Sequence, residues 1–545
     1  MTLVFQNSLT KKGKTKKPII NVPIADVCLL LEGTYPFVPG GVSSWVHSLI
    51  KGLPELRFSL FMILPDEKKK KLAYEIPSNV TGLYILQLSR KGYLENNRFS
   101  FFKNGKYLKE IFEFHRNLLN QLPEQQEPAT GSSFLSSIDE IAHNTILQKE
   151  AVDTLAGFNS LSEIFSKQAW SIPTRIFSRN TWKTIKRLYN SRKLSCSFVD
   201  YFWTWRYLHS GIFAIMNAYV PKAKVYHTIS TGYAGLLGAR ASQLHNSPLL
   251  LTEHGIYNKE RKIDISRSPW IYEEKRHLFR AQKNLEVFKE LWIKAFTTMS
   301  KICYASSDLI ITLYTGNQKY QLQDGANPEI MRIIPNGIEF QKLSILKRIP
   351  QKRKIIGFVG RVVPIKDVKT FLRAVALVFK SFPGAEAWLM GPTDENKQYY
   401  EECAQLVDFL EIKDRVFFTG MVDLREYYPK LDVLVLTSIS EAQPLVILEA
   451  YCLEIPVVAT DVGSCRELIE GAPGKDAELG KSGLITGLTN PTETAMSILH
   501  LLRHPHESQK MGKIGKERVQ KYYDMPKLIH RYRQLYKNYI EKSQL

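Results

Sequence analysis

The chain has 545 residues, of which 44% are hydrophobic and 23% are charged, and this size and composition predict a globular protein of two or three domains. No apolar run approaches the ~18 residues that a membrane-spanning helix needs, and the polar, basic segment Met1–Lys17 does not resemble a secretory signal. The six cysteines lack CxxC spacing, which argues against a zinc site or a disulfide framework and favours a reducing cytoplasm.

The formal net charge is +21, and part of it lies in residues 1–20, which we expect to be a basic, disordered tail. A second part lies between Lys167 and Lys193, where eight basic residues and no acidic residues occur. Such segments attract polyanions, although charge runs are often only solvated faces. Because no helix-turn-helix, RNA-binding or zinc-finger motif is present, the sequence does not favour nucleic acid as the partner.

The segment Lys167–Lys193 also carries apolar side chains between its cations, at Trp170, Ile176, Phe177, Trp182, Ile185 and Leu188. This pattern suits peripheral contact with an anionic membrane or binding of an acidic partner. The alternative is a helix that packs its apolar side on the rest of its domain and turns its cations outward. Both interpretations stay open on the sequence alone.

In chain order, the first predicted element is a buried strand at Ala25–Leu31, followed by a loop with two glycines and an amphipathic helix from Gly41. Phe58–Leu64 is the next strand, so a βαβ unit opens a parallel sheet. Regular alternation stops between about residues 66 and 205, which we interpret as a mostly helical insertion. Alternation resumes at Val225, so residues 21–330 are predicted to form an N-terminal Rossmann-like domain.

Residues 331–515 are predicted to form a second domain, whose strands are short apolar runs at Ile355–Val359, Ala387–Met390, Val416–Phe418, Val433–Leu436 and Val457–Ala459. Near-continuous apolar strands separated by helices are typical of a parallel sheet covered on both faces. Residues 516–545 form a predicted terminal helical segment that could pack back on the N-terminal domain. The predicted fold class is α/β, with two doubly wound, Rossmann-like parallel-sheet domains facing each other across a cleft.

The richest candidate site follows the strand Val433–Leu436. A polar loop presents Glu441, and Pro444 suits a helix start because it lacks an N–H. The free amides of that helix start suit an anion such as a diphosphate. Glu449 lies within the helix, so the two carboxylates do not flank one bond and instead suit the hydroxyls of a sugar and a ribose. The alternative, a capping acid and a solvated acid, is disfavoured by the apolar neighbours of Glu449.

Two cations, Arg361 and Lys366, follow the first strand of the second domain. At the carboxyl end of a strand they could neutralise a leaving diphosphate, although both could also be surface charges of a basic protein. The sequence contains no Asp-x-Asp, so it offers no obvious paired-acid site for Mg²⁺ or Mn²⁺ on a diphosphate. We therefore expect no metal ligands and no cofactor.

The first domain offers weaker candidates. His254 ends a predicted strand, where it would face the cleft opposite Glu441 and could bind a sugar hydroxyl or help to move a proton. A hydrogen-bonded structural histidine is the alternative. Gly40 and Gly41 precede the first helix, and such a loop is more often a turn than a cradle for phosphate or sugar.

Several of these blocks resemble a known family. Glu441, seven residues and then Glu449, preceded by Arg361 and Lys366, resemble the donor-site signature of the family-four retaining glycosyltransferases of the GT-B fold. A narrower resemblance, to the PelF group of glycosyltransferases of Pel exopolysaccharide synthesis, rests on Leu31–Trp45, Thr252–Tyr257, Gly391–Glu395, Leu436–Glu441 and Asp461–Gly471. Residues 1–20 and much of 66–205 match only loosely.

The resemblance implies roles for the matching residues. Glu449 would hold the ribose hydroxyls, and Arg361 and Lys366 would carry the diphosphate. The donor sugar would be held by Glu441 and the backbone that follows it, at Ala442, Gln443, Pro444 and Leu445. The first domain would be the acceptor side, with His254 beside the donor sugar and with Gly40, Gly41, Glu253 and Tyr257 nearby. One departure is Glu454, which stands at a helix exit where such enzymes often have glycine.

The implied function is retaining transfer of a hexosyl or N-acetylhexosaminyl unit from a UDP-sugar to a growing, Pel-like exopolysaccharide of a biofilm. The implied location is the cytoplasm, at the inner face of the cytoplasmic membrane, with inner-membrane proteins of a polysaccharide synthase complex as partners. Two alternatives remain: a nucleotide-sugar epimerase of the same two-domain architecture, and a non-catalytic, nucleotide-binding scaffold of such a complex.

Overall fold

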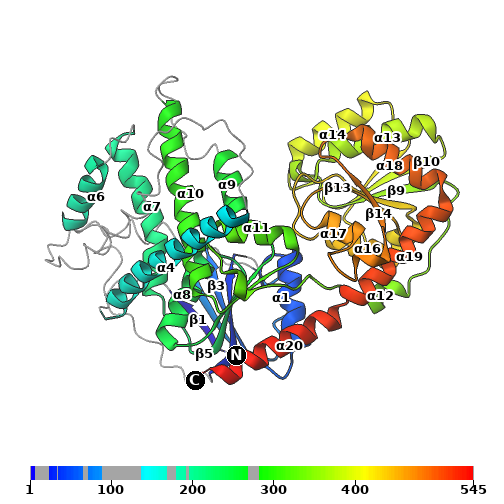
Figure 1. The fold of residues 1–545 in the computed structure, drawn as a ribbon. Helices are drawn as coiled ribbons and strands as arrows, with labels where there is room; N and C mark the ends of the chain where they lie inside the picture. The colour runs from blue at the N-terminus through cyan, green and yellow to red at the C-terminus, as the bar shows by residue number, and fades with distance from the viewer. Residues whose placement is uncertain are drawn as a thin grey trace. The chain divides into compact units, whose positions relative to one another are not determined.

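A computed structural model describes residues 2–6, 24–33, 35–65, 71–88, 137–167, 179–191, 196–267 and 281–543. The chain divides into two compact units, each built on its own sheet (Figure 1). The first unit contains Met1–Thr312, Gln318–Arg332 and Tyr532–Leu545, and the second contains Leu313–Asn317 and Ile333–Arg531. Within the described residues, no helix has the length and apolar character needed to cross a membrane.

The first unit has an eight-stranded sheet in the order β1-β4-β3-β2-β5-β6-β7-β8. Its strands are β1 (Thr2–Gln6), β2 (Ala25–Glu32), β3 (Phe58–Leu64), β4 (Val80–Gln87), β5 (Ala223–Thr228), β6 (Leu249–Glu253), β7 (Leu309–Thr312) and β8 (Met331–Ile333). The pairs from β1 to β7 are all parallel. Strand β3 is buried along its whole length and β2 along nearly all of it, as expected for a sheet covered on both faces.

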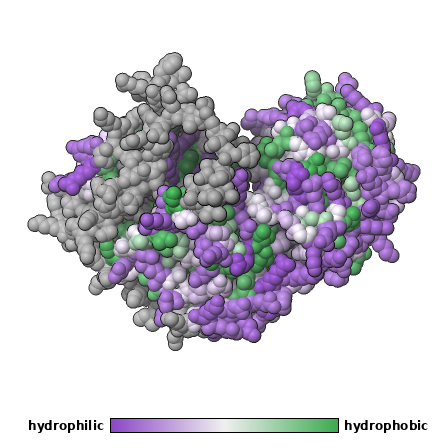
Figure 2. All heavy atoms as spheres, in the orientation of Figure 1, coloured by the Kyte–Doolittle hydropathy of each residue, from purple (hydrophilic) through white to green (hydrophobic). Residues whose placement is uncertain are grey.

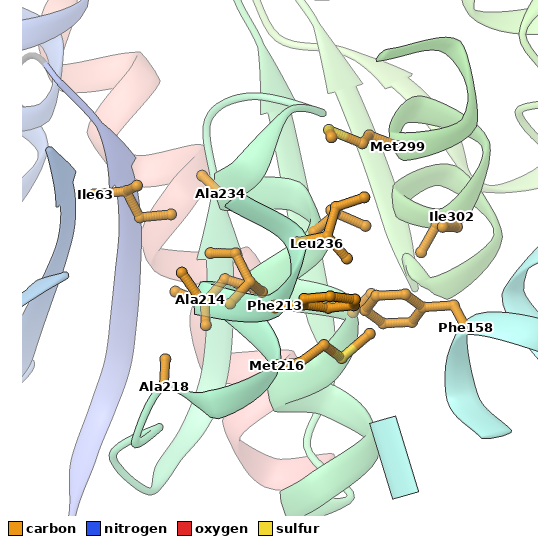
Figure 3. Close-up of a cluster of buried hydrophobic side chains, with 14 of the residues drawn as sticks. Ile63, Phe158, Phe213, Ala214, Met216, Ala218, Ala234, Leu236, Met299 and Ile302 are labelled. Carbon is orange, nitrogen blue, oxygen red and sulfur yellow. The ribbon is translucent and has the colours of Figure 1, made fainter. Parts of the chain in front are cut away.

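The helices of the first unit are α1 (Gly41–Gly52), α4 (Ser137–Lys167), α6 (Arg179–Ser191), α7 (Phe198–Asn217), α8 (Tyr233–His245), α9 (Tyr257–Arg267) and α10 (Ala281–Ser306), followed by α11 (Thr315–Gln323), which spans the division between the units. Figure 3 shows the centre of its core, where Phe158 of α4 lies beside Phe213 and Met216 of α7. Leu236 of α8 and Ile302 of α10 complete this part of the core.

Two strands of the first unit were not predicted. Strand β1 lies within the segment expected to be a disordered tail, yet Thr2–Gln6 pairs with Gly82–Leu86 of β4; most of the tail lies outside the described residues. Strand β4 itself lies within the predicted helical insertion, so that insertion cannot begin at residue 66. The β-branched and aromatic residues of Val80–Gln87 favour the strand, and its neighbour β3 supplies a fully buried partner.

The second unit has a six-stranded parallel sheet in the order β11-β10-β9-β12-β13-β14. Its strands are β9 (Lys354–Val359), β10 (Ala385–Met390), β11 (Val416–Gly420), β12 (Val433–Leu436), β13 (Val457–Thr460) and β14 (Gly483–Thr486). Its helices are α12 (Phe340–Ser344), α13 (Val368–Ser381), α14 (Lys397–Phe409), α15 (Leu424–Tyr427), α16 (Leu445–Cys452), α17 (Cys465–Glu470), α18 (Pro491–Arg503) and α19 (Pro505–Tyr522). Separate apolar clusters under α13, α14 and α18 and under α16, α17 and α19 cover the two faces. Two Rossmann-like, parallel-sheet domains are therefore confirmed.

The predicted boundary after residue 515 is wrong, because it falls inside the continuous helix α19. The helical structure is interrupted at Tyr523 and Asp524 instead, where Asp524 forms an isolated β-bridge with Ile338. The last helix, α20 (Met525–Lys542), enters the first unit at Tyr532. There Tyr536 hydrogen-bonds the Nδ1 of the buried His227 at 2.6 Å, and Tyr532 hydrogen-bonds Thr252 at 2.8 Å.

Glu454 follows α16 in the left-handed region, with φ +58°. The N–H of Ile455 donates to the carbonyl of Ala450, and the N–H of Glu454 donates to that of Tyr451, which is the hydrogen-bond pattern of a Schellman cap. The turn usual for glycine is thus kept with a glutamate, at a cost of roughly 1–2 kcal/mol for the left-handed backbone. An ion pair between Glu454 and Lys516 at 3.0 Å offsets part of that cost.

Candidate functional site

The second sheet has one topological switch point, between β9 and β12. From β9 the chain proceeds to β10 and β11 on one side, and from β12 it proceeds to β13 and β14 on the other. Loops that leave the carboxyl ends of two such strands run in opposite directions and leave room for a ligand. The loop after β9 carries Arg361 and Lys366, and the loop after β12 carries Glu441.

Lys366 and Glu441 meet across this switch point. The Nζ of Lys366 donates to Oε1 of Glu441 at 2.5 Å, and both side chains are mostly buried. A short, poorly solvated ion pair holds both groups in a fixed orientation. Two residues that lie 75 positions apart in the sequence therefore form one ion pair.

Backbone contacts fasten the loop after β12 to the loop after β9. The hydroxyl of Thr437 donates to the carbonyls of Lys366 and Asp367 at 3.2 and 2.9 Å. The N–H of Ile439 donates to the carbonyl of Ile365 at 2.8 Å. Because both ends of the ion pair are anchored through main-chain groups, the charges are pre-positioned before any ligand arrives.

A third loop, after β13, supports Glu441 from its backbone side. Gly463 has φ +56°, and a Cβ at this position would lie 2.2 Å from the carbonyl oxygen of Glu441 and 2.6 Å from that of Ala442. The next residue, Ser464, donates its N–H to the carbonyl of Ala442 at 2.8 Å. Glycine is required here both for the left-handed backbone and for the close approach of the loop that carries Glu441.

The remaining predicted donor residues lie at the start of α16 and within it. Pro444 is the N-cap rather than the first helical residue, and Leu445 begins the helix. The buried Gln443 accepts a hydrogen bond from the N–H of Asn336 at 2.7 Å. Glu449 is half-buried and accepts from the hydroxyl of Tyr428 at 2.7 Å, and burial raises the pKa of Glu449 above its usual range.

Arg361 is not part of this pair in the structure. Its guanidinium is 53% exposed and binds Glu395, which is 45% exposed, at 2.8 Å. Glu395 belongs to the loop after β10. Arg361 therefore lies at the same edge of the sheet as Lys366 but binds a different carboxylate. Because an exposed ion pair of this kind is weak, Arg361 can exchange Glu395 for another anion.

Four buried polar oxygens around these loops have no hydrogen-bond partner among the described residues. They are Oδ1 of Asn336, Oδ2 of Asp367, and the hydroxyls of Ser438 and Ser464. Buried polar atoms are nearly always hydrogen-bonded, so a cluster of exceptions needs an explanation. A polar ligand or bound water at the carboxyl edge of the sheet would satisfy them.

The first unit has a matching switch point between β2 and β5. Glu32, the last residue of β2, accepts from the hydroxyl of Ser230 after β5 at 3.0 Å and from that of Tyr257 at 2.7 Å. Tyr257 thus lies at the carboxyl edge of the sheet, and its acceptor-side role stays a prediction. Glu32 was not predicted, although an acid that directly follows five apolar strand residues was the signal that could have identified it.

His254 follows β6 and is buried, yet neither ring nitrogen has a hydrogen-bond partner among the described residues. Its ring lies edge-on to Trp45 of α1, with centroids 4.6 Å apart. Burial lowers the pKa of His254 to about 4, so the imidazole is neutral at pH 7 and one nitrogen can donate while the other accepts. The described residues therefore do not support the alternative, a structural histidine held by hydrogen bonds.

The other predicted residues of the first unit differ in their surroundings. Glu253 is buried, and its carboxylate accepts from Tyr304, Gln321 and the N–H of Tyr257 at 2.7, 3.0 and 3.0 Å, so its acceptor-side role stays a prediction. Gly40 and Gly41 are exposed, and a Cβ at either position would meet nothing within 4 Å. The glycine loop therefore leaves open space for a ligand to approach the backbone.

Replacing Glu253 by Gln is expected to remove one pH-dependent contribution to the stability of the first unit. Burial raises the pKa of Glu253 from 4.5 to about 7, so the folded unit favours the protonated carboxyl. The contribution of Glu253 to the free energy of unfolding is therefore complete below pH 4.5 and is lost as the pH rises to about 7. The stability of Glu253→Gln relative to wild type should therefore increase by about 3 kcal/mol over that interval. Urea unfolding followed by tryptophan fluorescence checks this, since seven of the eight tryptophans precede Leu313. A difference that is independent of pH would contradict it.

Among the described residues, one group of side chains could hold a metal ion: His500, His504 and Glu507. His500 lies in α18, and Glu507 lies in the first turn of α19. No donor-site residue named above belongs to this group.

Two families match the sequence. Residues 25–329, more than half of the chain, match the family described as "Domain of unknown function (DUF3492)". Residues 353–504 match the family described as "Glycosyl transferases group 1". The second match contains Arg361, Lys366, Glu441 and Glu449.

Among curated proteins, the chain is similar to a D-inositol 3-phosphate glycosyltransferase of Kineococcus radiotolerans, with 27% identity over 215 residues, covering 36% of this chain and 49% of that protein. It is also similar to the N-acetyl-alpha-D-glucosaminyl L-malate synthase of Bacillus anthracis, with 27% identity over 189 residues, covering 34% and 46%. The chain thus spans about half the length of the curated relatives that it matches.

Among solved structures, sucrose-phosphate synthase from Thermosynechococcus elongatus superimposes with a TM-score of 0.55 at 17% identity, covering 95% of this chain and all of that one. The protein HepE of Anabaena, solved in complex with UDP and glucose, gives a TM-score of 0.52 at 14% identity, covering 94% and 99%. At these identities the likeness shows the fold alone, which is the GT-B fold with its two Rossmann-like domains.

Proposed function

The chain belongs to the family described as domain of unknown function DUF3492, and because its second unit also carries the glycosyl transferases group 1 match, we propose that it is a glycosyltransferase that uses a UDP-sugar. The observation that carries this proposal is the mostly buried ion pair between Lys366 and Glu441 at the switch point of the second sheet. An anion-binding cation and a hydroxyl-binding carboxylate are the two groups that a sugar diphosphate requires side by side.

In this proposal the diphosphate competes with Glu441 for Lys366. The ammonium of Lys366 neutralises the charge that develops on the leaving UDP, together with the first amides of α16. Glu441, released from its partner, accepts hydrogen bonds from hydroxyls of the donor sugar. Arg361 can leave its exposed partner Glu395 and add a second cation, and the half-buried Glu449 accepts from the ribose. HepE, whose structure was solved in complex with UDP and glucose, supports a nucleotide-sugar at a unit of this fold.

The chemistry we propose is metal-independent transfer with retention at the anomeric carbon. The acceptor hydroxyl attacks on the face from which UDP departs, the bond between the sugar and the diphosphate breaks, and a departing phosphate oxygen takes up the hydroxyl proton. No enzyme nucleophile is needed. Because the sequence has no Asp-x-Asp to hold a metal ion, Lys366, Arg361 and the helix amides neutralise the negative charge of UDP in this proposal.

The acceptor is proposed to bind the first unit, at the open glycine loop of Gly40 and Gly41 and near His254 and Tyr257. A neutral imidazole with two unpartnered nitrogens suits hydroxyl groups. On the resemblance to the PelF group we propose a growing Pel-like exopolysaccharide as acceptor, a hexose or N-acetylhexosamine as the transferred sugar, and a cytoplasmic location beside inner-membrane proteins of a synthase complex.

A donor screen tests this function. UDP release should occur with one of UDP-glucose or the UDP-N-acetylhexosamines in the presence of a polysaccharide acceptor, without divalent cations. Glu441→Ala should lower that rate about 100-fold or more with the fold intact. Unchanged transfer in Glu441→Ala would contradict the assignment. An altered free sugar formed without acceptor would indicate an epimerase, and nucleotide binding without turnover would indicate a scaffold.

A further inference from the structure

Helices α6 and α7 form a pair whose inner faces are buried. Ile185 and Leu188 of α6 are fully buried and belong to the core of the first unit, as does Tyr201 of α7. The sequence had placed Ile185 and Leu188 among residues that could face a membrane, and the structure excludes this for both. Trp170, Ile176 and Phe177 lie outside the described residues.

The outer faces of the same two helices carry two different stripes. On α6, Lys183, Lys186 and Arg187 are exposed, and the surface over α6 is hydrophilic at the left edge of Figure 2. On α7, exposed apolar and aromatic residues recur at every fourth position: Val199 is 61% exposed, and Trp203 and Tyr207 are 38% exposed. Residues four apart share one face of a helix, so α7 presents a continuous aromatic stripe to solvent.

Trp182 joins the two stripes. It lies on the outer face of α6 with 42% exposure, and its ring contacts Phe198 and Phe202 of α7 at centroid distances of 5.1 and 5.0 Å. Phe202 contacts Trp203 at 5.7 Å, and Trp203 contacts Tyr207 at 6.1 Å. The indoles and the phenol therefore form one surface, which we call the α6–α7 aromatic surface, bordered by the cations of α6.

The charge of this surface is mainly positive. Helix α6 contains no acidic residue. Helix α7 contains a single acid, Asp200, and its carboxylate binds the hydroxyl of Ser197 at the helix start. Arg206 adds a buried cation over the ring of Trp203, 4.7 Å from the centroid. Attraction to an anionic surface is therefore not cancelled within the helix pair.

We propose that the α6–α7 aromatic surface binds the interface of an anionic membrane. Tryptophan and tyrosine prefer the headgroup level, where the ring is in an apolar region and its polar atom is hydrated. Neighbouring lysines and arginines bind anionic headgroups. A protein interface tends to have lysine-poor, fully buried aromatic anchors, whereas here three exposed cations border half-exposed rings. The proposal concerns a site separate from the donor site and does not depend on transferase activity.

Co-sedimentation with vesicles tests the proposal on the full chain. Binding should be strong with phosphatidylcholine vesicles that contain about a third of phosphatidylglycerol, weak with phosphatidylcholine alone, and reduced at high salt. Each cation removed is expected to lower the partition coefficient about five-fold. Lys183→Ala, Lys186→Ala and Arg187→Ala together should thus weaken binding about 100-fold.

A matched control separates this surface from the general positive charge of the chain. Arg503→Ala, Lys510→Ala and Lys513→Ala remove the same charge from exposed positions of α18 and α19 in the second unit and should leave lipid binding nearly unchanged. Equal losses of vesicle binding in the two triple variants would overturn the proposal. A partition coefficient of the α6 triple variant that equals that of wild type would also overturn it.

Trp203→Ala with Tyr207→Ala tests the aromatic stripe. This double variant should bind vesicles more weakly than wild type, and brominated lipids should quench its tryptophan fluorescence less, with Trp182 as the remaining tryptophan described on this surface. Binding of the double variant that equals wild type would overturn the role of the stripe and point to a protein partner. UDP release, measured on every variant in solution, should stay unchanged, so loss of lipid binding is distinguishable from failure of the proposed function.

Discussion

Lys366→Met is expected to lower the rate of UDP release at saturating donor by about 100- to 1,000-fold. Lys366 is the cation at the switch point of the second sheet, and its substitution removes the charge that would stabilise the leaving diphosphate. It also leaves Glu441 mostly buried without a partner, so the affinity for the anionic donor should fall as well. Initial rates over a range of donor concentrations separate the effect on kcat from that on KM.

Lys369→Met is the matched control for this experiment. Lys369 lies in the first turn of α13 and pairs with Glu402 at 2.6 Å, so the substitution also removes one lysine and one ion pair from the same unit. The partner, Glu402, is 41% exposed, so loss of this ion pair should change the rate of UDP release less than about two-fold. Equal rates for the two variants would mean that Lys366 has no special role.

Gly463→Ala is expected to displace the loop that carries Glu441 without removing a charged group. A Cβ would lie 2.2 Å from the carbonyl oxygen of Glu441, so the segment that carries Glu441 must move. The left-handed backbone adds roughly 1–2 kcal/mol of strain. We expect a lower melting temperature and a loss of transfer of at least about ten-fold, because a small misplacement of positioned groups is costly.

Gly474→Ala provides the comparison. Gly474 has φ +102°, and a Cβ there would meet nothing within 4 Å, so this variant carries backbone strain without the clash. Both variants should lose stability, but only Gly463→Ala should lose transfer. A fully active Gly463→Ala would show that the position of the Glu441 loop does not matter for the reaction.

The sequence predicted the second unit well because its signals are local. The strand Val433–Leu436 agrees with the structure to the residue, since short apolar runs of a parallel sheet alternate with amphipathic helices. The rule that ligands bind beyond strand ends then selected Lys366 and Glu441, which the structure joins. Their contact across 75 residues could not be predicted, because it depends on the order of the strands.

Other features depend on tertiary contacts that the sequence does not reveal. Strand β4 was hidden in a segment with mixed patterns, and its pairing with the buried strand β3 became visible only in the structure. Glu32 was overlooked because its partners, Ser230 and Tyr257, are about 200 residues away. Arg361 and Lys366 were assigned to one diphosphate because both follow strand β9; in the structure the guanidinium of Arg361 binds Glu395 of another loop, and its role at the diphosphate stays a prediction.

Calorimetric titration of the full chain with UDP, in buffer containing EDTA, tests the central claim most directly. That claim is that the carboxyl edge of the second sheet, with Lys366 and Glu441, binds a nucleotide diphosphate without a metal. We predict saturable binding of one UDP per chain, weakened at least about ten-fold by Lys366→Met and almost unaffected by Lys369→Met. Absence of binding in EDTA, or equal affinities of wild type and Lys366→Met, would contradict the claim.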